Sequence, residues 1–463
     1  MMKDIQCDVL IVGCGVAGLY CALNLPENLD VVVITKSQAE KCDSYLAQGG
    51  ICVLKDESDY ESYFEDTLKA GHYENNRRSV ELMIRNSPEV IRDLISYGTR
   101  FEKDSDGRLK YTREGAHSTP RILFHEDITG EEITSHLLAV VRTLKNVRLL
   151  ENTTMLDITE ASAGGKRYCT GVIAGSEGNV FPIRSTETVW ACGGIGGLFA
   201  HSTNYPHLTG DALGIALRHG IPLQNPDYIQ IHPTTLYTGS QENAVRKDCA
   251  FLISESVRGE GGILYNKLPK DGGVRFVNEL LPRDVVTNAI LAQMEKDGTP
   301  CVWLSMENIP EKEITGHFKH IYERCLEEGY DCTKEPVPVV PAQHYFMGGV
   351  DVDEKSRTAM NGLYAVGETS CNGVHGKNRL ASNSLLESLV FARIAARSIE
   401  SEIKSIRALN FGAAALNPAE YQDTENLFRG YKKIILDEIK RMKEYHERNN
   451  HENEHGQLDS RSA

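Results

Sequence analysis

Two arginines and two histidines stand in settings from which their side chains could bind a small anion. Arg283 lies just ahead of a predicted helix, and Arg379 lies in a loop rich in glycine and asparagine. An arginine flanked by small residues can present its guanidinium group to a carboxylate through two parallel hydrogen bonds. Together the two arginines could clamp a dicarboxylate. A surface or structural ion pair is the alternative role for each.

The histidines, His232 and His344, mark the two ends of a segment that reads as an insertion, residues 226–341. They can meet at a domain junction although they are far apart in the sequence, and ligand sites commonly lie at such junctions. A satisfied structural hydrogen bond is the alternative role for either histidine. Glu114 is a further candidate, but its spacing gives it no advantage over the other acidic residues.

A glycine pattern near the start of the chain predicts a site for a dinucleotide. An apolar run, residues 8–12, leads into Gly13, Gly15 and Gly18, and an apolar segment of helical spacing follows. In this pattern the first glycine makes a tight turn, and the second lets the backbone approach a pyrophosphate. The third lets helix and strand pack closely, while the helix N-terminus faces the anion. An ordinary glycine-rich turn is the alternative.

The second predicted strand, residues 30–35, is followed by Lys36. Enzymes that bind NAD usually place an acidic residue at this point to hold the ribose. The absence of that acid argues against NAD as the dinucleotide. Lys36 could face a phosphate or a ribose, and a surface position is the alternative.

Length and charge limit the classes of function. A chain of 463 residues should hold two or three domains. The net charge of −15 argues against nucleic acid or an anionic membrane surface as the main partner. No apolar run reaches the roughly 18 residues that span a bilayer, and the first strand leaves no room for a signal peptide. We therefore expect a cytoplasmic protein.

The cysteines predict neither a metal site nor a disulfide framework. The chain has 12 of them, without a C-x-x-C pair or the Cys/His spacing of a metal site. Cys14, Cys21 and Cys192 lie in apolar segments, where we expect buried thiols. A reducing cytoplasm suits such thiols.

Apolar periodicity predicts an α/β fold in which the insertion interrupts a Rossmann-like domain. We expect helices within residues 58–98, 284–295 and 384–400, and strands at residues 146–150, 155–159, 171–175, 188–194 and 361–367. Residues 1–225 and 342–402 would then form one discontinuous domain, and residues 226–341 a second domain of α+β type that caps it. Residues 403–463 would form a short helical segment, with a disordered polar tail from His446.

Taken together, these segments resemble the flavoprotein superfamily of succinate dehydrogenase, fumarate reductase and L-aspartate oxidase. The resemblance covers about residues 8–400. Beyond the N-terminal glycines, its marks are Ala47–Gly50, Ala191–Gly194, Thr209–Asp211, His232–Pro233, Arg258–Gly261, Pro282–Asp284, His344–Gly349 and His375–Leu386. The resemblance implies that the dinucleotide is FAD and that the insertion is the capping domain of the superfamily.

Two features resemble the L-aspartate oxidase branch. The segment Thr112–Gly130 is similar to that branch, whereas dehydrogenase and reductase subunits carry a Gly/Gln-rich stretch there. The respiratory subunits attach FAD through a histidine four residues before the alanine of Ala-Gln-Gly-Gly, and this position is Asp43 here. The resemblance therefore implies FAD that is held non-covalently.

The resemblance also implies roles for individual residues in binding FAD. The pyrophosphate would lie on Gly13, Cys14, Gly15, Val16, Ala17 and Gly18, with Lys36 near the adenosine. Residues close to the flavin would be Ser44, Gln48, Gly49 and Gly50. Further contacts with FAD would come from Asp211, Glu368, Ser384 and Leu385.

For the substrate, the resemblance implies a site made of several cations and one anion. Arg379, His232 and His344 match the residues that bind carboxylates, and Arg283 matches the acid/base arginine. Glu114 matches the carboxylate that meets the substrate amine, and Arg258 and Glu255 match positions nearby in the cap. Because L-aspartate carries an ammonium group and succinate does not, Glu114 best separates the two possible substrates.

The reaction implied is the oxidation of L-aspartate to iminoaspartate, with closure of the cap excluding water. Oxygen or fumarate would reoxidise the flavin. In fumarate reduction Arg283 would donate a proton, which is unusual for a group whose pKa is normally above about 12. Iminoaspartate would pass to quinolinate synthase, on the route to NAD.

Two other functions are the alternatives. One is a soluble fumarate reductase or a respiratory flavoprotein subunit of the succinate dehydrogenase type, and Asp43 and Glu114 argue against it. The other is an FAD-binding redox scaffold without catalysis, which would not need the two arginines and two histidines. One departure from the superfamily is that only about 60 residues follow the flavin domain. This puts in doubt any oligomer or partner contact of a longer C-terminal domain.

Overall fold

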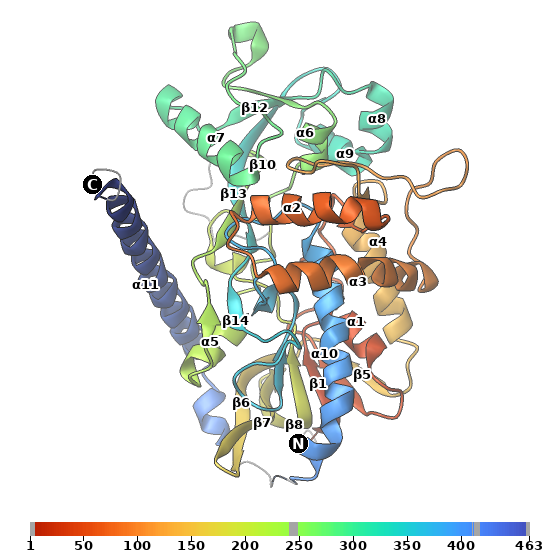
Figure 1. Cartoon of the computed structure of the whole chain (residues 1–463), viewed down its shortest axis with the longest axis vertical. Coiled ribbons are helices and arrows are strands. Elements are labelled where there is room, and N and C mark those ends of the chain that lie inside the picture. The colour runs from red at the N-terminus through yellow and green to blue at the C-terminus, as the bar shows by residue number, and fades with distance from the viewer. Residues whose placement is uncertain (1–4, 240–248, 410, 412–416, 460–463) are drawn as a thin grey trace.

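A seven-stranded sheet forms the base of the computed structural model, which describes residues 5–239, 249–409, 411 and 417–459 (Figure 1). Along the sheet the strands are β5 (Val147–Leu150), β2 (Val31–Ile34), β1 (Ile5–Val12), β8 (Asn179–Trp190), β7 (Lys166–Ser176) and β6 (Thr154–Ala163), and β15 (Leu363–Ala365) also pairs with β8. The pairs among β5, β2, β1, β8 and β15 are parallel, and β6 and β7 are antiparallel. These strands confirm the strands predicted from apolar runs.

Alternating side chains place the two faces of the sheet in two hydrophobic cores. In β2, Val31 and Val33 face one core, and Val32 and Ile34 face the other. All four side chains are buried, as a parallel strand covered on both faces requires. This is why the strand reads as an unbroken apolar run in the sequence.

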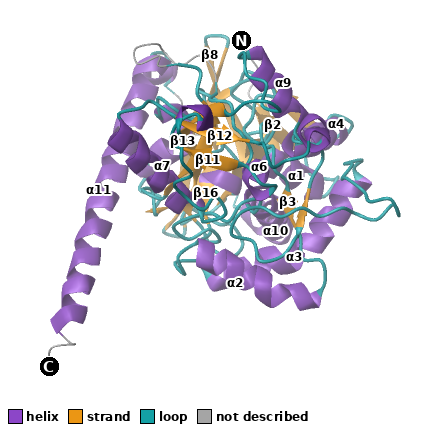
Figure 2. Cartoon of the chain, turned by 90° about the horizontal axis from the view of Figure 1, so that it is seen from above, coloured by secondary structure: helices purple, strands orange, loops and turns teal. Residues whose placement is uncertain are grey.

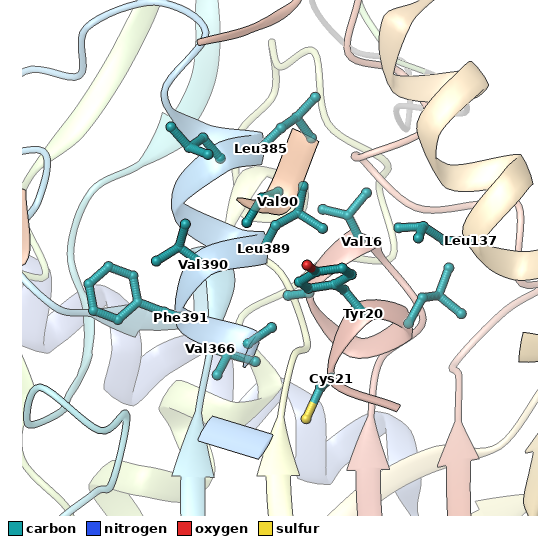
Figure 3. Close-up of a cluster of buried hydrophobic side chains, with 14 of the residues drawn as sticks. Val16, Tyr20, Cys21, Val90, Leu137, Val366, Leu385, Leu389, Val390 and Phe391 are labelled. Carbon is teal, nitrogen blue, oxygen red and sulfur yellow. The ribbon is translucent and has the colours of Figure 1, made fainter. Parts of the chain in front are cut away.

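Helices cover both faces of the sheet. The first face carries α1 (Val16–Asn24), α2 (Tyr60–Ala70), α3 (Arg77–Ser96), α4 (Thr129–Val141) and α10 (Ser384–Arg407). Figure 3 shows part of this core, where Tyr20 of α1 lies among Val90, Leu137 and Leu389. The second face carries α5 (Asp211–Arg218) and part of α11 (Thr424–Asp459).

A second body of structure, with its own core, lies above this layered domain in Figure 1. Its antiparallel sheet has the order β10 (Ile229–Leu236), β13 (Val337–Phe346), β12 (Val302–Ser305) and β11 (Ile263–Tyr265). Its helices are α6 (Glu255–Gly259), α7 (Arg283–Asp297), α8 (Glu311–Gly316) and α9 (Lys319–Glu327). We call this body the cap. It comes from the segment expected to be inserted, although β13 runs five residues past the expected boundary at residue 341.

The remaining elements are short. They are the strands β3 (Ile51–Cys52), β4 (Ile122–Leu123), β9 (Leu223–Gln224), β14 (Gly349–Asp351) and β16 (Ser370–Cys371), and the 3₁₀ helices Glu57–Asp59, Gly196–Leu198, Pro269–Asp271, Gly367–Thr369 and Pro418–Tyr421. Strands β3 and β4 pair with each other, and β16, β14 and β9 form a small sheet.

The C-terminal segment differs from the prediction. We expected disorder from His446, but α11 continues to Asp459, and of this tail only residues 460–463 lie outside the described part of the chain. Ion pairs at i,i+4 spacing, such as Lys440 with Glu444, support the helix, and His446 Nδ1 lies 2.8 Å from Asp227 Oδ2. Figure 2 shows the C-terminal end of this helix pointing away from the rest of the molecule.

Ten of the 12 cysteines are buried. Burial was correctly predicted for Cys14 and Cys21 but not for Cys192, which is half-buried because it follows β8 at the wall of a cavity. No helix in the described ranges is long and apolar enough to cross a membrane. The same ranges hold no cluster of three or more His, Cys, Asp or Glu side chains that could bind a metal ion.

Candidate active site

A cavity of about 450 Å³ extends from the main sheet to the underside of the cap. Val12, Ile34, Ala191 and Val366 line it at the carboxyl ends of β1, β2, β8 and β15. In open α/β sheets, ligands bind at these ends of the strands. The opposite part of the cavity is lined by side chains from the cap, including Arg283 and Glu255.

The first part of the cavity meets the N-terminus of α1. Gly15 is the N-cap residue and supplies no side-chain cap, and the Val16 N–H donates to Ser44 Oγ at 3.2 Å. Gly13 has φ +113°, and a Cβ there would collide with the Ala191 carbonyl. A Cβ on Gly18 would collide with the Gly13 carbonyl, so this glycine allows helix and strand to pack closely. The geometry fits a pyrophosphate at a helix N-terminus.

Most residues predicted to bind the cofactor line this cavity. They are Gly13, Cys14, Gly15, Ala17, Lys36, Ser44, Gln48, Gly49, Gly50, Asp211, Glu368, Ser384 and Leu385. Val16 and Gly18 do not line it, because the Val16 side chain belongs to the core and Gly18 packs on Gly13. Backbone groups are what these two positions can offer a ligand.

Lys36 occupies the cavity wall in an ion pair. Its Nζ lies 2.7 Å from Asp211 Oδ2 and donates to Thr209 Oγ1 at 3.1 Å. The same ammonium lies 4.7 Å from the centre of the Phe428 ring, which belongs to α11. The pair with Asp211 offsets the positive charge of Lys36, and the C-terminal helix supports it from behind.

Buried carboxyl groups border the middle of the cavity. The Phe346 N–H donates to Glu368 Oε1 at 2.8 Å. Burial, and then the nearby Asp43, raise the pKa of Glu368 to about 8. Asp43 accepts a hydrogen bond from the Tyr205 N–H at 2.9 Å and also lines the cavity. A carboxylate thus stands at the position that the resemblance connects with covalent attachment of FAD.

The cap end of the cavity gathers guanidinium and imidazole groups. Arg379 donates to Ser384 Oγ at 2.9 Å and to His344 Nε2 at 3.1 Å. Because a guanidinium group only donates, His344 carries its ring proton on Nδ1, 2.7 Å from Thr203 Oγ1. Burial, and then Arg283 and Arg379, hold the pKa of His344 well below its ordinary value. His344 is therefore a neutral imidazole that accepts a hydrogen bond from the cationic Arg379.

His232 and His344 come together because β10 and β13 pair, with ring centroids 5.1 Å apart. The Thr234 N–H donates to His232 Nδ1 at 3.2 Å, so the ring proton lies on Nε2. That Nε2 is buried and has no hydrogen-bond partner among the described groups. His232 does not itself line the cavity. A buried donor without a partner next to a cavity is a candidate for binding an anionic ligand.

Three charged residues of the cap form a buried chain. Glu255 Oε2 accepts from Arg283 Nε and lies 3.2 Å from an amino nitrogen of Arg258. Burial alone would raise the pKa of Glu255, but Arg258 and Arg283 outweigh burial and hold that pKa below its ordinary value. Arg283 and Glu255 line the cavity, and Arg258 lies behind them. Glu255 therefore connects Arg283, at the cavity, with Arg258 in the interior of the cap.

Glu114 is a nearly inaccessible carboxylate at the cavity wall, with 3% of its surface exposed. Its Oε1 accepts from Ser256 Oγ at 2.9 Å, and its Oε2 accepts from Ser382 Oγ at 2.6 Å. Burial, and then the nearby Glu255, raise the pKa of Glu114. The raised pKa favours the neutral carboxyl group in the empty site, and the charge of a cationic ligand group at this wall would favour the ionised carboxylate.

The sequence does not predict some residues of the site. Gln230 accepts from Arg283 at 3.0 Å and donates to the Arg379 carbonyl at 2.9 Å, so it joins the two arginines. The period of two along a strand would have indicated it, because it lies two residues before His232 on β10. Ser256 and Ser382 carried no signal, since only the fold brings them to Glu114.

Comparison with known proteins gives consistent results. Residues 8–385 match the family model described as FAD binding domain. L-Aspartate oxidase of Clostridium perfringens is 46% identical over 94% of this chain and 95% of its own length. L-Aspartate oxidase of Clostridium acetobutylicum is 46% identical over 87% of this chain and 90% of its own length. Among solved structures, quinol fumarate reductase of E. coli superposes with a TM-score of 0.78 at 29% identity, covering 95% of this chain and 75% of that one.

Proposed function

The chain belongs to the L-aspartate oxidase family of FAD-dependent flavoproteins, and from this membership we propose how its residues divide the work of the reaction. The reaction is the oxidation of L-aspartate to iminoaspartate, with oxygen or fumarate as the final electron acceptor. It is the first step of de novo NAD biosynthesis. The observation that carries the assignment of roles is the buried carboxylate of Glu114 at the end of the cavity where Arg283 and Arg379 lie.

When bound, FAD supplies the acceptor for the hydride that leaves Cα of the substrate. We assign its pyrophosphate to the backbone of residues 13–18, at the N-terminus of α1, where Gly15 supplies no capping side chain. Lys36 and Asp211 would lie on its adenosine side, and Gln48, Gly49 and Glu368 near its flavin. Because Asp43 offers no imidazole for a covalent bond, we propose that FAD is held non-covalently.

The substrate carries two carboxylates and one ammonium group, and the charges of the site match this pattern. Arg379 and the free Nε2–H of His232 would bind carboxylate oxygens, and His344 would hold the Arg379 guanidinium in place through its Nε2. Glu114 would hold the ammonium group and take a proton from it as the C=N bond forms. A buried side chain that forms an ion pair with a ligand discriminates strongly against ligands that lack the charged group. Succinate lacks the ammonium group, so Glu114 would give selectivity for the amino acid.

Arg283, Glu255 and Arg258 would serve the opposite direction of electron flow, the reduction of fumarate. Arg283 faces the cavity, and its link to Glu255 and then Arg258 could carry a proton to it from the interior of the cap. Closure of the cap would exclude water from these three linked side chains. We assign Arg283 as the acid/base residue and Arg258 as the residue that supports it.

We also propose the finer organisation. A discontinuous Rossmann-like FAD-binding domain would comprise residues 1–225 and 342–402, with residues 226–341 as the capping domain and residues 403–463 as a C-terminal helical segment. The protein would act in the cytoplasm and pass iminoaspartate to quinolinate synthase.

Replacement of Glu114 tests the assignment of roles. Removing one partner of a buried charge pair costs about 2–5 kcal/mol, so Glu114→Gln should lower kcat/KM for L-aspartate by at least about 30-fold. The dissociation constant of succinate, read from the flavin spectrum, should change by less than about three-fold, because succinate has no group for Glu114 to bind. Arg379→Gln is the matched control and should weaken both ligands. If Glu114→Gln binds L-aspartate with full affinity, Glu114 does not bind the ammonium group of the substrate.

A further inference from the structure

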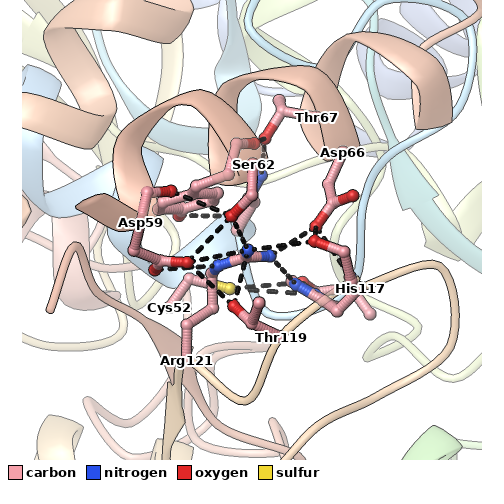
Figure 4. Close-up of polar contacts among 12 residues, drawn as sticks. Cys52, Asp59, Ser62, Asp66, Thr67, His117, Thr119 and Arg121 are labelled. Atoms are coloured by element: carbon pink, nitrogen blue, oxygen red, sulfur yellow. Dashed lines mark hydrogen bonds and ion pairs between the residues drawn. The ribbon is translucent and has the colours of Figure 1, made fainter. Parts of the chain in front are cut away.

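A buried polar network outside the cavity joins the two segments that carry Glu114 and Arg379. Its centre is Arg121, whose side chain is fully buried just before β4 (Figure 4). The guanidinium group donates to Asp59 at 3.1 Å, Asp66 at 2.6 Å, Ser62 at 2.9 Å, Thr119 at 2.8 Å and His117 Nδ1 at 3.0 Å. Asp59, Ser62 and Asp66 belong to α2 or directly precede it. The network therefore fixes the segment of residues 112–121 to this helix.

Arg121 sets the hydrogen-bonding state of His117. Because a guanidinium group only donates, His117 Nδ1 accepts and the ring proton lies on Nε2. Nε2 then donates to the Ala381 carbonyl at 3.0 Å. Burial, and then the adjacent Arg121, lower the pKa of His117 to about 4, so the ring stays neutral at ordinary pH. His117 thus connects Arg121 with the turn that contains Ala381.

That turn carries groups of the substrate site on both sides of Ala381. Arg379 comes two residues earlier, and Ser382 follows directly and donates to Glu114 Oε2. Ser382 has φ +61°, a left-handed conformation that a residue with a side chain keeps only when its surroundings hold it. The Cys52 N–H holds the Ser382 carbonyl at 3.0 Å, and Tyr63 of α2 donates to Asn383 Oδ1 at 2.7 Å.

His117 is also tied to Glu114 through the backbone, since the His117 N–H donates to the Glu114 carbonyl at 3.3 Å. Its main chain therefore belongs to the segment of Glu114, and its ring holds the turn of Arg379 and Ser382. No other described side chain makes hydrogen bonds to both Arg121 and the Ala381 carbonyl. The bond to Ala381 therefore links the two segments, and Cys52 Sγ donates to the same carbonyl at 3.5 Å.

We propose that His117, oriented by Arg121, is a positioning residue that sets the spacing between the ammonium-binding Glu114 and the carboxylate-binding Arg379. Through this spacing it makes the site selective for an amino dicarboxylate over a dicarboxylate without an amine. This inference rests on the proposed function, because the two binding roles are assigned there. His117 itself does not line the cavity.

A double-mutant cycle between His117 and Glu114 tests the inference, with the FAD-loaded enzyme and two ligands. His117→Leu should raise KM for L-aspartate about ten-fold and change the dissociation constant of succinate by less than about three-fold. In the Glu114→Gln background the same change should add less than about two-fold, because His117 acts through Glu114. His117→Gln, whose amide can both donate and accept, should recover most of the affinity for L-aspartate.

His317→Leu is the control, since His317 of the cap packs on Phe318 and on Phe124, and Phe124 lies outside both segments. It should lower thermal stability without changing KM. If His117→Leu does not bind FAD, Arg121→Lys replaces it, because lysine keeps the charge but loses the planar fork of donors. Equal losses for L-aspartate and succinate, or effects that multiply with those of Glu114→Gln, would overturn the inference.

The same experiment separates the inference from the proposed function. If the wild-type enzyme and Glu114→Gln behave as proposed and His117→Leu binds L-aspartate normally, only the positioning role fails. If Glu114→Gln has no effect on L-aspartate, the assignment of the ammonium site fails first.

Discussion

At the scale of single residues, the site depends on the protonation of one buried carboxyl group. Glu114 has a raised pKa because it is buried near Glu255, and the two serine hydroxyls and Arg283 act in the opposite direction. An ammonium group needs the ionised carboxylate. The affinity for L-aspartate should therefore fall as the pH falls through the raised pKa of Glu114, and recover above it.

This pH dependence is visible in kcat/KM for L-aspartate measured across the acidic and neutral range. The wild-type profile should decline toward acid at a pH above the ordinary value for glutamate of about 4.3. The kcat/KM profile of Glu114→Gln should lack this decline. Glu368, with a pKa of about 8, changes charge nearby, so its own Glu368→Gln variant serves as the comparison. A decline that persists unchanged in Glu114→Gln would assign it to another group.

At the scale of elements, the C-terminal helix contributes to the cofactor end of the cavity. Phe428 of α11 lies beneath the Lys36 ammonium, and Tyr431 of the same helix packs among the buried residues around α5. Asp211, the first residue of α5, pairs with Lys36. A helix far along the chain thus supports a charge pair at the cavity wall.

Phe428→Ala should weaken FAD binding. A cation over an aromatic ring contributes about 0.5–2 kcal/mol, so we expect the dissociation constant of FAD to rise about two- to thirty-fold. Titration of the FAD-free protein with FAD, followed by flavin fluorescence, measures this constant. Leu436→Ala, at an exposed position on the same helix, should leave it unchanged. An unaltered constant in Phe428→Ala would show that α11 does not support the cofactor end.

How much the sequence predicts also depends on the kind of element. The strands of the main sheet and the helices α7 and α10 are predicted because apolar spacing is a local property of the chain. Disorder from His446 was wrong, because low apolar content does not reveal ion pairs along a helix or a contact with Asp227. Arg121 was passed over for a similar reason: its acidic partners precede it by more than 50 residues, and only folding brings them together.

The individual candidates of the site differ in the same way. Motifs in the sequence predict the glycines, arginines and histidines of the site. The structure places Arg283, Arg379, His344 and Glu114 at one cavity. The positions of His232 and Arg258 behind the wall could not be predicted, because spacing does not give depth.

At the scale of the whole molecule, the site opposes the overall charge. The chain carries a net charge of −15, yet the cap end of the cavity gathers Arg283 and Arg379, with Arg258 just behind them. A local positive field inside a buried cavity can attract a dicarboxylate that the surface would repel. The cap is also fixed to the layered domain, since Asp127 accepts from His320 Nδ1 at 2.6 Å and from the Ile321 N–H at 2.9 Å. This contact lies at the N-terminus of α9, where a carboxylate is favourable.

The most direct test of the account is anaerobic reduction of the bound flavin by L-aspartate and, separately, by succinate. Without oxygen or fumarate, reduced FAD accumulates, and the loss of visible flavin absorbance reports transfer of the hydride from the substrate. We predict rapid bleaching by L-aspartate and none by succinate, because Glu114 would hold the ammonium group that only L-aspartate carries. Bleaching by succinate alone would rule out Glu114 as an ammonium-binding residue and place the chain's activity with the succinate dehydrogenases.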